Sequence, residues 1–344
     1  MKIINISHIA LNARNMKPVL DFYCDGLGMK KQFTLYYGDL LEYALKQAGE
    51  KELSEEEKKK IEMMKLIKDR PWLVYLKLQD RQFIELFYSY EEKEEITSRD
   101  RYYGYQKVGY EVKNIEDYYR KLLDKGIVME QPLAQSADYS MEFVVKDPEG
   151  NRIHFVEYTN EDESTETIVQ DPISDLLRTT QVAYQINNAE QMKRYYLDGL
   201  GLKIAKSMTF NDCADYLRKK HAEDLASRMP LILQLEQMGD LPWIDFVEVA
   251  KNQYIEFFYC YKEEKKTIEK TDKTYGYSHL CLEVEEIQSA YDELVRKGIK
   301  PETQISLGPD GSYQFWLKDP DGNRMELMEF TEHAKQLNEE GVVA

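Results

Sequence analysis

Apolar and polar positions follow one recurring order along the chain: a strand, a helix and then further strands. Four segments begin β-rich, continue with apolar residues at helical spacing and have a glycine near the helix end: 7–27, 108–126, 182–200 and 280–298. Short β-rich runs joined by Gly, Asn and Asp turns follow them, at 72–78, 83–88, 141–145, 153–158, 246–249, 254–259, 313–317 and 325–330. The pattern predicts an α+β fold of four βαβββ modules.

An internal repeat groups these modules into two halves. The heptapeptide KDPEGNR at 146–152 recurs as KDPDGNR at 318–324, 172 residues later. FYCDGLG at 22–28 and YYLDGLG at 195–201 keep nearly the same step. The sequence therefore predicts a tandem duplication with an acidic linker near 160–170. We expect a first domain over 1–160 with modules at about 1–95 and 100–160, a linker over 161–178, a second domain over 179–332 with modules at about 179–265 and 272–332, and a polar tail over 333–344.

The first and third modules carry insertions that the other two lack, at about 38–70 and 211–241. In the first insertion Ser54 and Glu57 have capping-box spacing, which predicts the start of a helix before a lysine-rich run. Such a charge run is typical of a solvated helix face. A lid over a pocket is the functional alternative.

Charge and cysteine content disfavour several classes of protein. The 344-residue chain has a formal net charge of −17, which repels nucleic-acid phosphates and anionic lipid surfaces. It has no apolar run near the roughly 20 residues that span a bilayer, and its first residues lack the features of a targeting signal. Its four cysteines show no C-x-x-C spacing and fit a reducing compartment. We therefore expect a cytoplasmic protein that binds neither nucleic acid nor membrane.

Residue types that ligate metals recur at two positions of the modules. In an alignment of the four modules, the first-strand position holds His8, Lys107, Gln181 and His279, and the last-strand position holds Glu85, His154, Glu256 and Glu326. Imidazole, amide and carboxylate groups suit Zn, Ni, Co, Mn or Fe. A carboxylate inside an apolar run, such as Glu326, costs several kcal/mol if it is buried without a partner. A metal ion would compensate that cost.

These features resemble the vicinal oxygen chelate superfamily, which includes glyoxalase I, methylmalonyl-CoA epimerase, fosfomycin-resistance enzymes and extradiol dioxygenases. The resemblance is carried by His8-Ile9-Ala10-Leu11 with Asp25-Gly26-Leu27-Gly28, by the two repeated heptapeptides and by the ligand positions. It covers nearly the whole chain and implies two glyoxalase-like domains with cup-shaped mixed sheets. In each cup two modules would supply the ligands of one divalent ion.

The resemblance leaves two ways to pair the modules. If the first and fourth pair, one cup holds His8, Glu85, His279 and Glu326, and the other holds Lys107, His154, Gln181 and Glu256. If neighbours pair, one cup holds Gln181, Glu256, His279 and Glu326, and the other holds His8, Glu85, Lys107 and His154. The long insertions favour the exchanged pairing by analogy with two-domain glyoxalases. Because a charged lysine is a poor ligand, we expect one metal ion per chain, and a cup with Lys107 that is metal-free, weakly loaded or adapted to an anionic ligand.

The activity implied by the resemblance is that of an isomerase or lyase that stabilises an enediolate or enolate of a small oxygenated substrate. Glu326 is then the candidate base, with Glu85 opposite it. An extradiol-type Fe(II) dioxygenase is an alternative, since His8, Glu85 and His154 would form a facial set under neighbour pairing. A third alternative, supported by the many tyrosines, is a pocket that sequesters a small molecule without turnover. The sequence identifies no substrate-binding residues.

Overall fold

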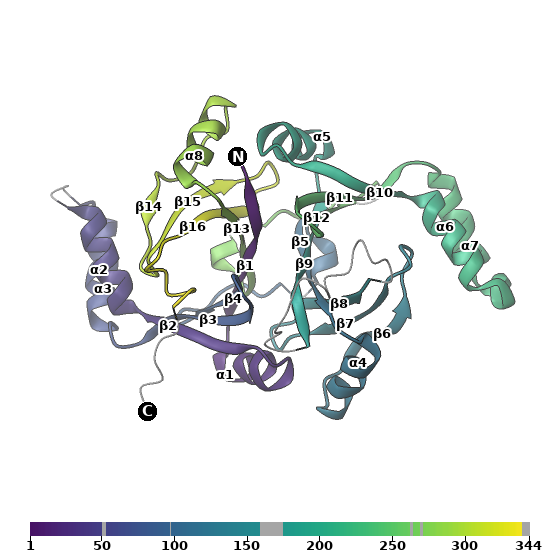
Figure 1. Ribbon diagram of the computed structural model, residues 1–344, viewed down its shortest axis with the longest axis horizontal. Coiled ribbons are helices and arrows are strands. Elements are labelled where there is room, and N and C mark those ends of the chain that lie inside the picture. The colour runs from purple at the N-terminus through teal and green to yellow at the C-terminus, as the bar shows by residue number, and fades with distance from the viewer. Residues whose placement is uncertain (50–52, 97, 159–174, 262–263, 269–270, 339–344) are drawn as a thin grey trace. The chain divides into compact units, whose positions relative to one another are not determined.

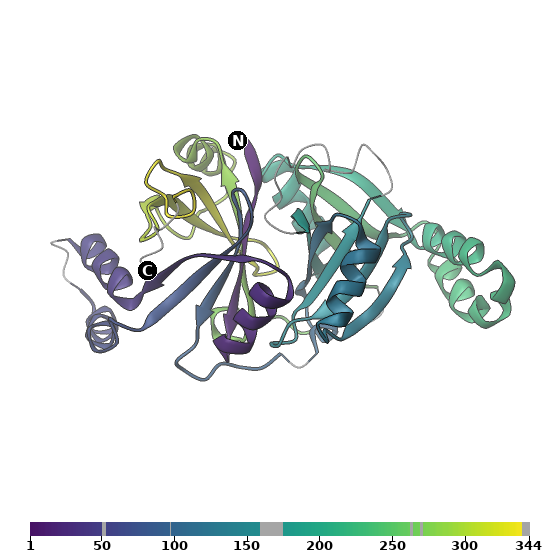
Figure 2. The same cartoon turned by 60° about the horizontal axis from the view of Figure 1, so that its bottom comes forward.

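The chain forms two eight-stranded mixed sheets in a computed structural model (Figure 1). The structure describes residues 1–49, 53–96, 98–158, 175–261, 264–268 and 271–338. The strands of the first sheet lie in the order β14 (Ser306–Leu307), β15 (Ser312–Lys318), β16 (Arg324–Phe330), β13 (Gly276–Val284), β1 (Ile3–Ala13), β4 (Gln82–Tyr88), β3 (Pro71–Gln79) and β2 (Lys30–Tyr36). Those of the second lie in the order β10 (Lys203–Thr209), β11 (Pro242–Ala250), β12 (Gln253–Tyr259), β9 (Leu176–Ile186), β5 (Gly104–Val112), β8 (Arg152–Glu157), β7 (Met141–Lys146) and β6 (Met129–Gln135). Each sheet curls into a cup (Figure 2), and the predicted α+β fold class is confirmed.

The two sheets combine modules that are distant in the sequence. The first and fourth modules build the first sheet, where β1 pairs antiparallel with β13, and the second and third modules build the other. Contacts define two compact units accordingly. Unit 1 comprises Met1–Ile96, Lys270–Lys318 and Arg324–Ala344, and unit 2 comprises Thr97–Glu269 and Asp319–Asn323. The sheets thus follow the exchanged pairing. Most of the predicted acidic linker lies outside the described residues.

Short helices connect the strands. They are α1 (Met16–Leu20), α4 (Ile115–Asp124), α5 (Ala189–Lys193) and α8 (Ile287–Arg296), with single turns η2 (Arg99–Arg101), η4 (Ala222–Asp224) and η5 (Thr271–Lys273). α1 and α5 each continue into a π-helical turn, η1 (Asp21–Gly26) and η3 (Arg194–Gly199). The Leu27 amide donates to the Phe22 carbonyl, five residues back, and Gly28 follows with a φ of 87°. The repeated DGLG sequence therefore ends both helices with a glycine that tolerates the left-handed region. None of the described helices is long and apolar enough to cross a membrane.

The two insertions form helical hairpins, α2 (Tyr37–Ala48) with α3 (Glu55–Leu66), and α6 (Phe210–Lys220) with α7 (Leu225–Met238). The predicted capping box is present, because the Glu57 amide donates to Ser54 Oγ and the Ser54 amide donates to the Glu57 carboxylate. Only Ile61 and Met64 of α3 are buried, as a solvated helix requires. The lid alternative gains no support, since no residue of α2 or α3 lines the cavity beside the candidate site.

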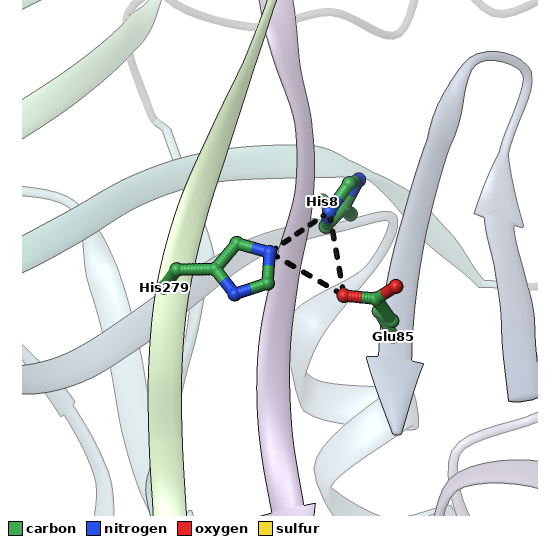
Figure 3. Close-up of side chains that lie close together, drawn as sticks. All are labelled: His8, Glu85 and His279. Carbon is green, nitrogen blue, oxygen red and sulfur yellow. Dashed lines mark hydrogen bonds and ion pairs between the residues drawn. The ribbon is translucent and has the colours of Figure 1, made fainter. Parts of the chain in front are cut away.

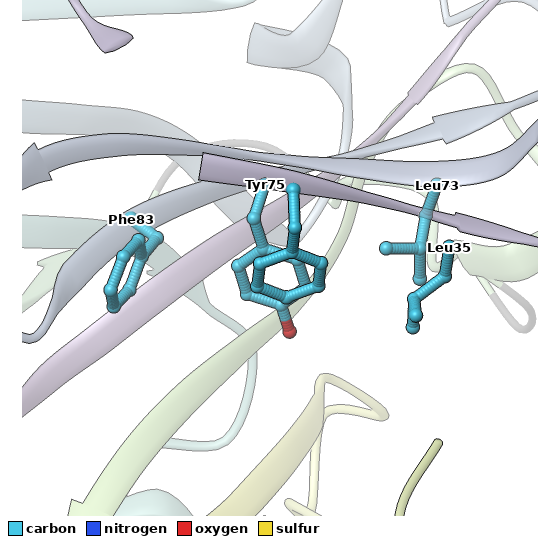
Figure 4. Close-up of a cluster of buried hydrophobic side chains, with 5 residues drawn as sticks. Leu35, Leu73, Tyr75 and Phe83 are labelled. Carbon is cyan, nitrogen blue, oxygen red and sulfur yellow. The ribbon is translucent and has the colours of Figure 1, made fainter. Parts of the chain in front are cut away.

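A cluster of buried side chains fills the concave side of the strands β2, β3 and β4 (Figure 4). Its members are Phe33, Leu35, Leu73, Tyr75 and Phe83. The Tyr75 ring stacks on Phe33 with a centroid distance of 4.7 Å and meets the His8 ring edge-on at 5.3 Å. The candidate site of unit 1 is therefore supported directly by core packing.

Candidate metal centre

Four neighbouring strands of unit 1 carry the predicted ligands of the exchanged pairing. In the order β16, β13, β1 and β4 they contribute Glu326, His279, His8 and Glu85. Ala10 lies opposite both His279 and Glu85, while Cys281 lies opposite both His8 and Glu326. This register brings side chains that are far apart in the sequence into one cluster, and Figure 3 shows three of them pointing toward one another.

The donor atoms of the four side chains converge. The two imidazole Nε2 atoms are 3.4 Å apart, and each lies close to both carboxylates. Glu326 Oε2 is 3.2 Å from His8 Nε2 and 3.6 Å from His279 Nε2. Glu85 Oε2 is 3.7 Å from His8 Nε2 and 3.3 Å from His279 Nε2. All four residues are at least 95% buried.

Two buried atoms of this cluster have no hydrogen-bond partner among the described residues, His8 Nδ1 and Glu85 Oε2. Of these, Glu85 Oε2 lies among the other donor atoms. Burial raises the pKa of this carboxyl to about 8, against the opposing effect of His8. A buried acceptor without a donor is costly, and a cation at the centre of the cluster would satisfy it. The set of two nitrogen and two oxygen donors fits a divalent ion such as Zn, Ni, Co, Mn or Fe.

The other three groups are tied together by hydrogen bonds. Burial acts to raise the pKa of Glu326, but bonds from His279 and His8 outweigh it and hold this pKa at about 2. Burial lowers the pKa of His279 to about 4. The pKa of His8 is raised instead, because the effect of burial is outweighed by Glu326 and Glu85. His279 Nδ1 lies 3.2 Å from Ser278 Oγ, a contact that orients its ring.

Aromatic residues and a further carboxylate form the walls of the site. A small cavity of about 80 Å³ is lined by Leu35, Trp72, Leu73, Tyr75, Glu85, Phe87, His279, Pro309, Asp310, Gln314, Trp316 and Glu326. Trp316 lies opposite Glu326 across the β15–β16 pair and meets the His279 ring at 4.7 Å. Asp310 is buried and accepts a hydrogen bond from Gln336, in the described part of the predicted polar tail.

These wall residues were not identified from the sequence. For Trp316 a signal existed, because it lies two residues before the second repeated heptapeptide, on the strand next to Glu326. Cys281 was also missed. It is buried in a second group of potential donors with His8 and Glu326.

Unit 2 brings together the other predicted set, with the same register. Lys107 lies opposite Ala183, which lies opposite Glu256, and Gly109 lies opposite both His154 and Gln181. Lys107 Nζ is 3.4 Å from His154 Nδ1 and 3.5 Å from Glu256 Oε2. The Lys107 ammonium thus lies between His154 and Glu256. The residues at these two positions in unit 1 are Glu326 and Glu85, which lie around the centre of the cluster there.

The sets expected from neighbour pairing are not assembled. Gln181 and Glu256 belong to the sheet of unit 2, whereas His279 and Glu326 belong to that of unit 1. His154 is likewise on a different sheet from His8 and Glu85, so the facial set considered for a dioxygenase is divided. The physical reason is the strand order, because β1 pairs with β13 rather than with β5.

Comparisons with known proteins agree with this architecture. The family model of the Glyoxalase/Bleomycin resistance protein/Dioxygenase superfamily matches residues 5–155 and 178–327. Glyoxalase I from Zea mays is similar in structure, with a TM-score of 0.56 and 12% identity over 94% of this chain and 92% of that chain. A putative dioxygenase from Bacillus subtilis has a TM-score of 0.59 and 10% identity over 95% of this chain and 86% of that one. A search of curated proteins gives no significant match. At these identities the similarity concerns the fold.

Proposed function

We propose, since the chain belongs to the Glyoxalase/Bleomycin resistance protein/Dioxygenase superfamily, that unit 1 is a metal-dependent isomerase or lyase. Its substrate would be a small molecule with two neighbouring oxygen atoms. The observation that carries the proposal is the convergence of two imidazoles and two carboxylates, one of which has a buried oxygen without a partner.

His8 and His279 would hold the ion through Nε2, and Glu85 and Glu326 through their Oε2 atoms. When bound, a divalent ion supplies positive charge that stabilises the negative charge developing on the substrate oxygens. The rings of Tyr75 and Trp316, which lie against the two imidazoles, keep water away and fix the ring orientations.

Glu326 is the proposed base. Its carboxylate is ionised and lines the cavity beside Trp316. In an isomerisation it would take a proton from the carbon next to a carbonyl group and return it to the neighbouring carbon, so that the carboxylate ends unprotonated. Glu85, on the other side of the imidazole pair, would remain a ligand.

The cavity limits the class of substrate. Its volume of about 80 Å³ is smaller than the roughly 150 Å³ cavity that accepts benzene. Three carboxylates line it, and none of its lining residues is lysine or arginine. The lining therefore offers an anionic conjugate no cationic side chain, so we expect a small uncharged hydroxycarbonyl compound.

Metal analysis tests the proposal. After reconstitution with each candidate ion, elemental analysis should give one ion per chain. Glu85→Ala should weaken metal binding, whereas the matched variant Glu256→Ala in unit 2 should not. Proton exchange of small α-hydroxy ketones in D₂O, followed by NMR, should then require the metal. No bound ion at any concentration, or two tightly held ions, would contradict the proposal.

A dioxygenase is a second candidate, because His8, Glu85 and His279 alone make a set of two histidines and one carboxylate. It predicts oxygen uptake with catechols by the Fe(II)-loaded protein. Glu326 disfavours it, since a fourth ligand leaves less room for oxygen and catechol together.

A further inference from the structure

The cup of unit 2 contains the larger cavity of the two. It measures about 310 Å³ and is lined by Asp100, Gln106, Lys107, Gln131, Glu142, Val144, Arg152, His154, Gln185 and Phe258. Lys107 and His154 hold the strand positions that His279 and Glu326 hold in unit 1. This size suits a small metabolite rather than a few water molecules.

A hydrogen-bond network occupies both ring nitrogens of His154 and the amide of Gln181, whereas Glu256 Oε2 has an ion pair with Lys107 and no hydrogen bond among the described residues. His154 Nε2 donates to Glu142 Oε2 at 2.7 Å, and its Nδ1 accepts from Gln181 Nε2, also at 2.7 Å. The Tyr158 hydroxyl lies 3.4 Å from Gln181 Oε1 and 2.5 Å from Thr180 Oγ1. Both ring nitrogens of His154 are therefore engaged by neighbouring side chains, so neither is free to ligate a metal ion.

Gly109 makes this network possible. A Cβ at this position would lie 2.5 Å from Gln181 Cγ, so only glycine lets the glutamine pass over the strand to His154. The equivalent position in unit 1 is Cys281. The two units thus differ at this backbone position, Gly109 in unit 2 and Cys281 in unit 1, as well as in the side chains of the two cups.

The ammonium of Lys107 supplies the positive charge in this cup. It has three donor hydrogens, and its two close neighbours here are Glu256 Oε2 and His154 Nδ1. The side chain also lines the cavity and is 21% exposed. One N–H can therefore bind a ligand oxygen, with the Phe258 ring 5.5 Å from Nζ as an apolar wall.

The opposite wall is anionic. Glu142 lines the cavity, and its side chain is 27% exposed. Burial acts to raise the pKa of Glu142, but His154 and Lys107 outweigh this effect and hold the pKa at about 2. The other charged pair at the cavity, Arg152 with Asp100, is joined at 2.5 Å, and Arg152 also binds Glu130. Lys107 and Glu142 lie on either side of the His154 ring and present one ammonium and one carboxylate to the cavity.

We propose that the cup of unit 2 is a metal-independent binding site for a small zwitterion of the α-amino acid class. Lys107 would bind the ligand's carboxylate, Glu142 its ammonium group, and Phe258 and Val144 would contact its side chain. A simple anion would be repelled by Glu142, and a simple cation by Lys107. The inference is independent of the activity proposed for unit 1.

Isothermal titration calorimetry with the full-length protein tests this site. The probes are the protein amino acids, followed for each that binds by its deaminated acid and its decarboxylated amine. We expect at least one amino acid to bind, and both truncated analogues to bind at least tenfold more weakly. Lys107→Met and Glu142→Gln should each lose at least tenfold in affinity while remaining folded and keeping the metal content of the wild type.

His279→Ala provides the control. It should lose the metal of unit 1 and keep amino acid binding, so that failure at one site is distinguishable from failure at the other. The proposal is overturned if no amino acid binds the folded protein, if affinity is unchanged in Lys107→Met, or if the wild type holds a second divalent ion that Lys107→Met does not alter.

Discussion

At the scale of single residues, the two cups differ mainly in how a positive charge is supplied. Strand register is shared, but His279 of unit 1 is replaced by Lys107 of unit 2, and Glu326 by His154. An ammonium carries its charge on the chain itself, whereas a cluster of neutral imidazoles and carboxylates needs an added cation. Replacements at these positions would therefore separate a metal centre from a metal-independent pocket on the same scaffold.

Glu326→Gln separates proton transfer from metal binding. An amide retains a ligating oxygen but cannot accept a proton, so we expect turnover to fall by about 10²- to 10⁴-fold while the metal stays bound. Steady-state kinetics and elemental analysis of the same preparation measure both quantities, with Glu256→Gln as the matched control in unit 2. Wild-type turnover in a metal-loaded Glu326→Gln protein would remove this residue from the mechanism.

His8→Ala and Gln181→Ala test which cup holds the metal. His8 lies within 3.7 Å of both carboxylates in unit 1, whereas Gln181 donates to His154 in unit 2. We expect His8→Ala to weaken metal binding at least tenfold and to lose most of the metal-dependent rise in melting temperature. Gln181→Ala should retain both. A metal-dependent rise that survives His8→Ala and disappears in Gln181→Ala would place the ion in the other cup.

The sequence could predict the four clustered residues because each recurs at an equivalent position in the modules, where its chemical type stands out. Tyr75, Glu142 and Trp316 could not be predicted in the same way. They reach the sites from strands adjacent to the ligand strands, and an aromatic residue on a strand is far more often part of the core.

At the scale of elements, strands were predictable where the sheet buries them. All nine residues of β13 are buried, and Leu280, Leu282 and Val284 of this strand form the β-rich start of a segment recognised in the sequence. The edge strands β2 and β10 are different, since each begins with an exposed lysine and has few buried residues, Phe33 and Leu35 in β2 and Met208 in β10, and they did not appear as separate runs. Charged edge strands resist pairing with other chains. The exposed lysines that make these strands hard to recognise in the sequence therefore also protect the sheet edges.

Asp245 joins three elements of unit 2. This buried carboxylate on β11 accepts hydrogen bonds from Ser207 on β10 and Tyr259 on β12, and it pairs with Lys193 of α5 at 2.8 Å. Burial acts to raise its pKa, but these partners outweigh that effect and lower it. The carboxylate therefore stabilises the fold above its unfolded pKa near 3.8, and the effect is lost as the pH falls through the lower pKa of the folded state.

Asp245→Asn should lower the free energy of unfolding by about 2 kcal/mol at pH 7. The difference from the wild type should shrink as the pH falls below about 4. Urea denaturation of both proteins at pH 7 and pH 3 measures it, with Asp240→Asn as a control at an exposed carboxylate. A difference that is the same at both pH values would show that the charge of Asp245 is not responsible.

At the scale of the whole molecule, the repeat predicted the modules but not which of them share a sheet. In both pairings the first strand of one module pairs with the first strand of another. Which two modules share a sheet depends on contacts such as that between His8 and His279, which are 271 positions apart. No local pattern encodes such contacts. The insertions favoured the exchanged pairing only by analogy, and the strand order has now decided it.

This exchanged order predicts how the molecule responds to a single cut. Each sheet contains strands from both sequence halves, with β1 paired to β13 in one and β5 paired to β9 in the other. If a protease site is placed between residues 160 and 170 and cleaved in the folded protein, the two fragments should remain associated and keep the bound metal, because two long central strand pairs hold them together. Size-exclusion chromatography with elemental analysis of the cleaved protein checks this.

As a control, cleavage in urea followed by dilution of each fragment alone should give no metal binding, since the four ligands are divided between the fragments: His8 and Glu85 in one, His279 and Glu326 in the other. Separation of the native cleaved protein into two stable halves, one of them still holding metal, would contradict the exchanged sheets.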